Sequence, residues 1–154
     1  MIKATDENIK SLVDEGIKKY GPNADLNYID TSEVTDMGFL FSWRNFNGDI
    51  SLWDVSGILY MNDMFLNTNF NRDISKWDVH NVMTTTYMFY DSSFNRDINQ
   101  WDISKVKCMT NMFYNKIYDQ EITWDVDLKE LFGDEYDNYL ERRKLKLLKD
   151  LCIV

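Results

Sequence analysis

The decapeptide "FNRDISKWDV" occupies residues 70–79, and "FNRDINQWDI" follows it 24 residues later, at residues 94–103. The same spacing relates nine columns of residues over three successive copies. Three of these columns are Phe46, Phe70 and Phe94; Trp53, Trp77 and Trp101; and Asp49, Asp73 and Asp97. Self-similarity at a fixed period of this length predicts a stack of structural repeats, in which each copy buries its apolar side chains against its neighbours.

The repeat weakens in both directions along the chain. Residues 25–41 keep the register upstream, and residues 118–126 keep it downstream, except that Trp124 arrives one position early. We therefore predict one domain, residues 1–154, in which residues 22–126 form four repeats of 24 residues plus a degenerate fifth. The open ends of such a stack need covers, so we expect helical caps over residues 1–21 and 127–154.

Each copy contains two apolar patterns. The pattern I-x-x-W-x-V, as in Ile74, Trp77 and Val79, is typical of a short strand whose alternate side chains point inward. Val82, Thr85, Met88 and Phe89 follow at spacings that favour one face of a short helix. Together they predict an α/β solenoid, a leucine-rich-repeat-like stack of short parallel strands and short helices with a helical cap at each end.

Composition and charge restrict the function. The 154 residues are 44% hydrophobic, which favours a folded domain, and carry a net charge of −9, which argues against direct binding to nucleic acid. We expect no membrane-spanning segment, because no window is apolar enough, and no signal peptide in the N-terminal residues. The chain as given is thus expected in the cytoplasm, or at the cell surface if a leader has been removed.

The sequence offers little for catalysis. It has one histidine, His80, two distant cysteines and no glycine-rich phosphate-binding motif. We therefore predict that the protein is not an enzyme, with no catalytic residues, no metal site and no cofactor.

Aspartates form the densest polar pattern. Asp30, Asp54, Asp78 and Asp102 should form an acidic row along the stack, which Asp125 continues. Stacked carboxylates repel one another unless backbone N–H groups at turns compensate them, which is the structural interpretation. The functional interpretation is that the row binds Ca²⁺ or a basic partner.

Positions at which the copies differ are the best candidates for binding another protein. Exposed tyrosines beside acidic residues suit such an interface. The alternative is that these positions are simply solvated. The candidate protein-binding residues are Trp43, Arg44, Tyr60, Asp63, Lys76, Tyr87, Tyr90, Lys107 and Tyr114.

The repeats also resemble a known family. "FNGDISLWDVSGILYMNDMF" (46–65), "FNRDISKWDVHNVMTTTYMF" (70–89) and "FNRDINQWDISKVKCMTNMF" (94–113) are similar to BspA-type leucine-rich repeats of bacterial surface proteins and mycoplasma lipoproteins. The resemblance implies a leucine-rich-like solenoid with a binding role, often at a cell surface, and it brings no catalytic residues.

These observations predict a non-enzymatic, protein-binding repeat scaffold that acts on a protein partner through its solenoid surface. Because that surface is acidic, it suits a basic partner. The alternative is a small acidic inhibitor or nucleic-acid mimic, from a phage or mobile element, that occupies a basic channel of its target. Residues 22–126 hold seven basic and fifteen acidic residues, a net −8, which suits this alternative. The identity of the partner and the oligomeric state stay open.

Overall fold

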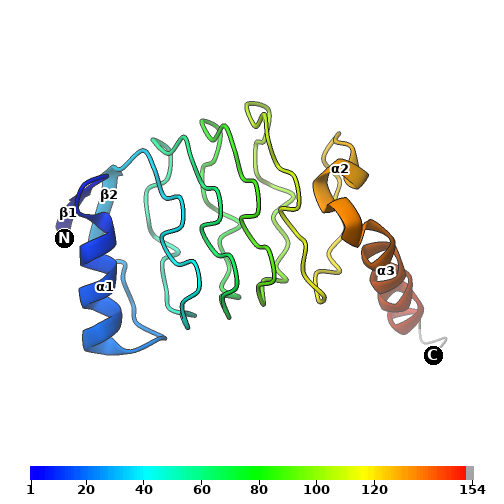
Figure 1. The fold of residues 1–154 in the computed structure, drawn as a ribbon, viewed down its shortest axis with the longest axis horizontal. Helices are drawn as coiled ribbons and strands as arrows, with labels where there is room; N and C mark the ends of the chain where they lie inside the picture. Colours follow the sequence, from blue (N-terminus) through cyan, green and yellow to red (C-terminus); the bar gives the residue numbers. More distant parts are fainter. Residues whose placement is uncertain (152–154) are drawn as a thin grey trace.

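The computed structural model describes residues 1–151 of the chain. Its regular elements are β1 (Ile2–Thr5), α1 (Ile9–Tyr20), β2 (Ile29–Glu33), α2 (Leu128–Phe132), the 3₁₀ helix η1 (Gly133–Glu135) and α3 (Tyr136–Asp150). They lie at the two ends of an elongated molecule, and the coils between them follow one another side by side (Figure 1). We number these coils as residues 22–45, 46–69, 70–93, 94–117 and 118–126.

The N-terminal end is covered by α1 and a small sheet. In α1 the apolar spacing places Ile9, Val13 and Gly16 against the body of the protein, and the helix ends at Gly21, whose positive φ of 84° suits glycine. Strand β1 pairs in parallel with β2, with Ile2 opposite Ile29. This pairing gives the first coil a hydrogen-bonded neighbour on its outer side.

The predicted α/β solenoid is wrong. The described residues contain only two short parallel strands, both at the N-terminal end, and no helix between α1 and α2. Where a strand and a helix were expected in each copy, the chain runs through bends and turns, joined to adjacent copies by isolated bridges such as Tyr60 with Thr84. The physical reason is that the backbone N–H groups donate within tight turns and to the neighbouring coil, not four residues back along a helix.

Two columns of phenylalanine rings form the core between the coils. Phe41, Phe65, Phe89 and Phe113 follow one another with centroid separations of 5.4–5.7 Å, and Phe46, Phe70 and Phe94 at 6.2–6.3 Å. The two columns touch where one coil passes into the next, as with Phe89 and Phe94 at 3.9 Å. The expected burial of Trp53, Trp77 and Trp101 is confirmed, since each is at most 4% exposed.

Polar side chains join each coil to the next. The indole N–H groups of Trp53, Trp77 and Trp101 donate to the carbonyls of Leu26, Ile50 and Ile74, each 27 residues earlier. In the asparagine column the side chain is the acceptor instead of the donor. Asn47 Oδ1 accepts from the backbone N–H of Asn71, and Asn71 Oδ1 accepts from the backbone N–H of Asn95. These bonds satisfy buried backbone groups that a strand ladder would otherwise pair.

A succession of turns forms one long side of the stack, which we call the turn face: residues 36–43, 60–67, 84–91 and 108–115. Alternate N–H groups of each segment donate to carbonyls of the next, as from Met61, Asp63, Phe65 and Asn67 to Thr84, Thr86, Met88 and Tyr90. The same segments close turns internally, for example from Met64 to Met61. The turn face is therefore rigidly connected although it has no regular secondary structure.

The C-terminal end is covered by α2, η1 and α3. Asp127 caps α2 by accepting from the N–H groups of Lys129 and Glu130. Phe132 extends the ring column, with its centroid 5.6 Å from that of Phe113 and 3.9 Å from that of Tyr139. Helix α3 follows at the C-terminal end (Figure 1), and its Arg142 and Lys146 side chains bond to Tyr118 and Asp119 of the fifth coil.

Candidate functional site

The turn face presents a row of exposed aromatic side chains. Trp43 is 73% exposed and Phe39 is 63% exposed, while Tyr60 and Tyr87 are each more than a third exposed. A group of large apolar side chains exposed to solvent on one surface is unusual in a folded protein. Such patches mark sites of interaction with other proteins. The turn face is therefore the best candidate for a functional surface.

Backbone conformation fixes these side chains in place. Phe39, Trp43, Asp63 and Tyr87 have φ between 55° and 60°, in the left-handed region that bulky residues rarely adopt. Each is the third residue of a turn, the position that requires positive φ in a type II turn. Strain of this kind persists only where surrounding bonds enforce it, and here the bonds between coils do so.

Tyrosines gather at the C-terminal half of the turn face. Tyr90 stacks on Tyr114 with ring centroids 4.6 Å apart, and Tyr87 meets Tyr90 edge-on at 5.4 Å. Desolvation beside these rings, together with the nearby Tyr114 and Asp91, raises the pKa of Tyr90 above its ordinary value. The cluster is a pre-ordered surface that presents ring faces and hydroxyl groups together.

Asp63 lies in the same column as Phe39 and Tyr87. Partial burial raises the pKa of its carboxyl above the ordinary 3.8, and no cation among residues 1–151 contributes to this shift. A desolvated carboxylate without a counter-ion is unfavourable, and a basic group from outside the chain would relieve that cost.

The structure brings most of the predicted binding residues together. Trp43, Tyr60, Asp63, Tyr87, Tyr90 and Tyr114 all belong to the turn face. Arg44 follows it directly but pairs with Asp14 of α1, and Lys107 precedes its last segment. Lys76 lies apart, in a shallow pocket of about 260 Å³ beside Leu52 and Asp73.

Sequence reasoning missed Phe39, the second most exposed aromatic side chain of the turn face. The available signal was its column, in which Phe39, Asp63, Tyr87 and Asn111 differ in every copy. Function was predicted where the copies differ, and this column meets that criterion, but the prediction named only Asp63 and Tyr87 from it.

The acidic rows lie at turns, as the structural interpretation predicted. Asp30, Asp54, Asp78 and Asp102 each accept from the N–H group two residues ahead, with donor–acceptor distances of 3.0–3.4 Å. The second row does the same: Asp49 accepts from Ser51 and Asp73 from Ser75, both at 2.9 Å. These bonds offset the repulsion between stacked carboxylates.

The pKa values of these carboxyls predict an acid-sensitive fold. Backbone hydrogen bonds from Ser51 and Ser75 hold the pKa of Asp49 and Asp73 below 3.8, and hydrogen bonds from Ser104 do so for Asp102. A depressed pKa in the folded state contributes stability above the unfolded-state value, which is lost as pH falls through the folded value. We expect the melting temperature to be level near neutral pH and to fall below about pH 4.

Thermal melts from about pH 6 to about pH 2 measure this dependence. The double variant Asp49→Asn/Asp73→Asn is the matched control, because each amide oxygen can still accept the turn bond but does not titrate. It should lose less stability in acid than the wild type. A melting temperature that stays level down to about pH 2 would contradict the assignment.

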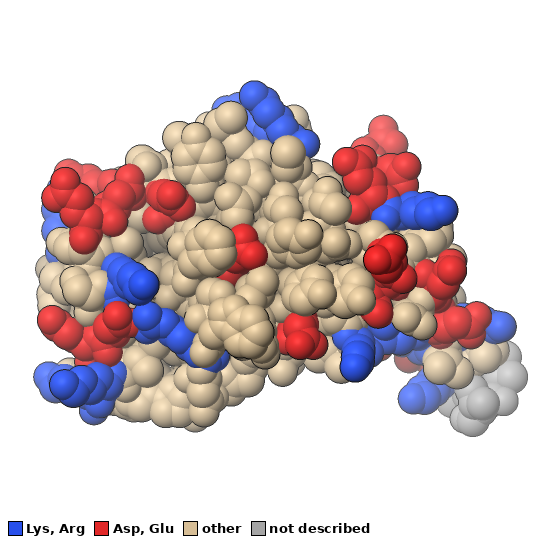
Figure 2. Space-filling model, viewed as in Figure 1, with Lys and Arg blue, Asp and Glu red and all other residues tan. Residues whose placement is uncertain are grey.

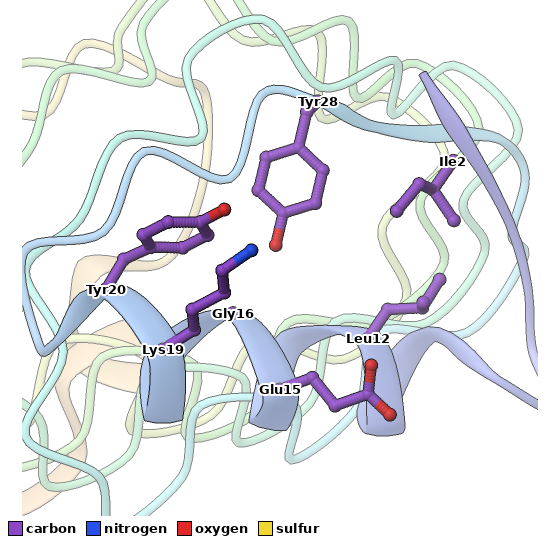
Figure 3. Close-up of a pocket in the computed structure, with 7 residues that line it drawn as sticks. All are labelled: Ile2, Leu12, Glu15, Gly16, Lys19, Tyr20 and Tyr28. Carbon is purple, nitrogen blue, oxygen red and sulfur yellow. The ribbon is translucent and has the colours of Figure 1, made fainter.

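A second candidate is a groove at the N-terminal end, between α1 and β2 (Figure 3). Leu12 and Ile2 form its apolar part, and the Lys19 amino group lies between the Tyr20 and Tyr28 hydroxyls (Figure 3). A Cβ at Gly16 would lie 2.5 Å from Leu26 and 2.7 Å from the Tyr28 hydroxyl, so glycine lets Tyr28 lie over the helix. No titratable group here combines burial with a specific partner, so we assign no chemistry to the groove.

Charge is unevenly distributed over the molecule. In the view of Figure 2 uncharged side chains dominate the middle, and acidic side chains gather toward both ends. Within residues 1–151 no group of three or more histidine, cysteine or acidic side chains is arranged to hold a metal ion. No helix in the same residues is long and apolar enough to cross a membrane.

Comparison with known proteins gives one family. A family model described as "Mycoplasma protein of unknown function, DUF285" matches residues 8–127, which include α1 and all five coils. No curated protein and no solved structure matches the chain.

Proposed function

We propose that this chain, which belongs to the Mycoplasma protein family DUF285, is a non-enzymatic scaffold that binds a basic protein through its turn face. The observation that carries the proposal is the row of exposed aromatic side chains beside acidic groups, in which Phe39, Trp43 and Tyr87 have positive φ. The sequence resemblance to BspA-type repeats supports it, because that resemblance implies a binding role.

The chemistry of the turn face favours arginine and lysine side chains. Aromatic ring faces attract cations by about 0.5–1 kcal/mol at exposed sites. Asp36, Asp63 and Asp91 lie in the same segments, whereas these segments contain no lysine or arginine. A basic segment of the partner would place cations over the rings and pair one of them with Asp63.

Substitution of the exposed aromatics tests the proposal. We expect Trp43→Ala and Tyr87→Ala to reduce capture of the partner from an extract of the native host by about tenfold or more, because truncated aromatic anchors cost about 2 kcal/mol or more. Quantitative mass spectrometry of the proteins retained on the immobilised chain measures this. Leu52→Ala is the matched control, since Leu52 is 79% exposed but lies outside the turn face.

Equal capture by wild type and both aromatic variants would refute the role of the turn face. A salt series on the same captured protein separates this proposal from the alternative of an acidic inhibitor or nucleic-acid mimic. Binding through rings and one desolvated ion pair should weaken gradually with salt. A steep loss, together with displacement by nucleic acid, would favour the mimic.

A further inference from the structure

A groove of about 390 Å³ lies between the fourth coil and the degenerate fifth. We call it the C-terminal groove. Its apolar walls are Ile103, Val106 and Met109 on one side and Trp124 on the other, and Asp102 and Asp125 also line it. It adjoins the last segment of the turn face, to which Met109 belongs, but its other lining residues lie outside the turn face.

The groove exists because core columns are uncovered there. Val106 is partly exposed, whereas its equivalents Ile58 and Val82 are buried. Likewise Met109 is partly exposed, whereas Met61 and Thr85 are buried. In the inner coils the next copy covers these positions, but after the fourth coil the chain reaches only Val126 in the repeat register before α2 begins at Leu128.

Backbone groups along the groove lack the partners that their equivalents have. Met61 and Thr85 donate their N–H groups to carbonyls of the following coil, but the equivalent N–H of Met109 donates no backbone hydrogen bond within residues 1–151. The carbonyls of Leu59 and Met83 accept from the following coil. The equivalent carbonyl of Lys107 accepts no backbone hydrogen bond from residues 1–151. This edge therefore offers one donor and one acceptor, two residues apart.

In contrast to the groove, the backbone of residues 118–120 in the fifth coil is covered by α3. There α3 supplies Tyr139, Arg142 and Arg143, which donate to the carbonyls of Gln120, Tyr118 and Asp119. Within residues 1–151, no helix covers the groove side in this way. In addition, the indole N–H of Trp124 is buried and has no acceptor in residues 1–151, unlike those of the three tryptophans before it.

We propose that the C-terminal groove binds an extended apolar peptide segment of a partner protein, which adds the missing neighbour to the fourth coil. The peptide backbone pairs with Met109 N–H and Lys107 C=O, as when a strand adds to an open sheet edge. Its apolar side chains cover Val106 and Met109, as the next copy does elsewhere. A basic residue beside them would meet Asp102 and Asp125.

A peptide copied from the chain itself is the probe. Residues 55–62, "VSGILYMN", carry Ile58 and Met61 in the columns that the groove leaves uncovered. Fluorescence anisotropy with the labelled peptide should give saturable binding to the full chain. Met109→Lys should weaken it by about tenfold or more. Leu52→Lys, on another surface, should leave it unchanged.

Two further measurements keep the proposal testable if Met109→Lys is poorly folded. Hydrogen exchange of the Met109 amide in the wild type should slow when the peptide is added, because the amide gains an acceptor. Peptides methylated at alternate backbone nitrogens should bind more weakly when the pairing nitrogens are blocked. Absent binding, equal binding of a scrambled peptide, or an unprotected Met109 amide would each overturn the proposal. So would self-association of the wild type that Met109→Lys abolishes, since it would assign the groove to a second copy.

Discussion

Replacing Trp77 with alanine lowers the free energy of unfolding by about 3–5 kcal/mol. The indole is 4% exposed, lies between the coils beside Phe65 and donates its N–H to the carbonyl of Ile50 at 3.3 Å. The substitution therefore leaves a cavity and removes one of the two donors to the Ile50 carbonyl, which still accepts from the Trp53 N–H. Urea titration followed by circular dichroism measures the loss.

Trp43→Ala is the control for Trp77→Ala. Trp43 is the same residue type but is 73% exposed, so its removal should change the free energy of unfolding by no more than about 0.5 kcal/mol. Equal unfolding midpoints for the wild type and Trp77→Ala would show that the indole columns do not hold the coils together.

Replacing Phe65 with alanine should cost about 3–5 kcal/mol as well. Its ring centroid lies 5.4 Å from that of Phe41, 4.2 Å from Phe70 and 5.6 Å from Phe89, so the substitution interrupts its own ring column and removes a contact with the other. Calorimetry should show a lower melting temperature. Phe65→Leu, which retains much of the volume, should lose less than Phe65→Ala.

Phe39→Ala provides the matched comparison at an exposed phenylalanine of the turn face, where little stability should be lost. If Phe65→Ala and Phe39→Ala melted alike, burial could not be the source of the stability assigned to the ring columns.

The sequence was sufficient to predict the buried tryptophan and phenylalanine columns. The 24-residue period identified the tryptophan and phenylalanine columns, because only residues repeated in every copy can share one continuous interior. It also predicted that backbone N–H groups at turns would compensate the aspartate rows, as at Asp54 and Ser56. Both predictions depend on the repetition of residue types and not on the backbone conformation between them.

Secondary structure could not be read from the same pattern. The spacing of Val82, Thr85, Met88 and Phe89 fits one face of a helix, but it fits consecutive turns equally well. What decides between them is positive φ at Tyr87 and Asp91, which interrupts a helix. Neither residue is glycine, so the sequence carried no direct signal of the left-handed conformation.

The binding surface was only partly predictable for a related reason. Variation between copies singled out Trp43, Tyr60 and Tyr87, and the turns place these residues on one face. Lys76 varies as much but lies elsewhere. The C-terminal groove was not predicted. It arises because one residue is missing before Trp124 and because α2 starts early. The effect of these two changes on the neighbouring coils depends on three-dimensional packing.

The ring and amide columns have a consequence for how the gene can change. The inner coils make equivalent bonds to their neighbours, and bonds such as that from Asn71 to Asn47 join residues one full copy apart. Recombination between the near-identical decapeptides at 70–79 and 94–103 would delete or duplicate 24 codons and leave every remaining column in register. Chains of this kind can thus change length in whole copies while conserving both end structures.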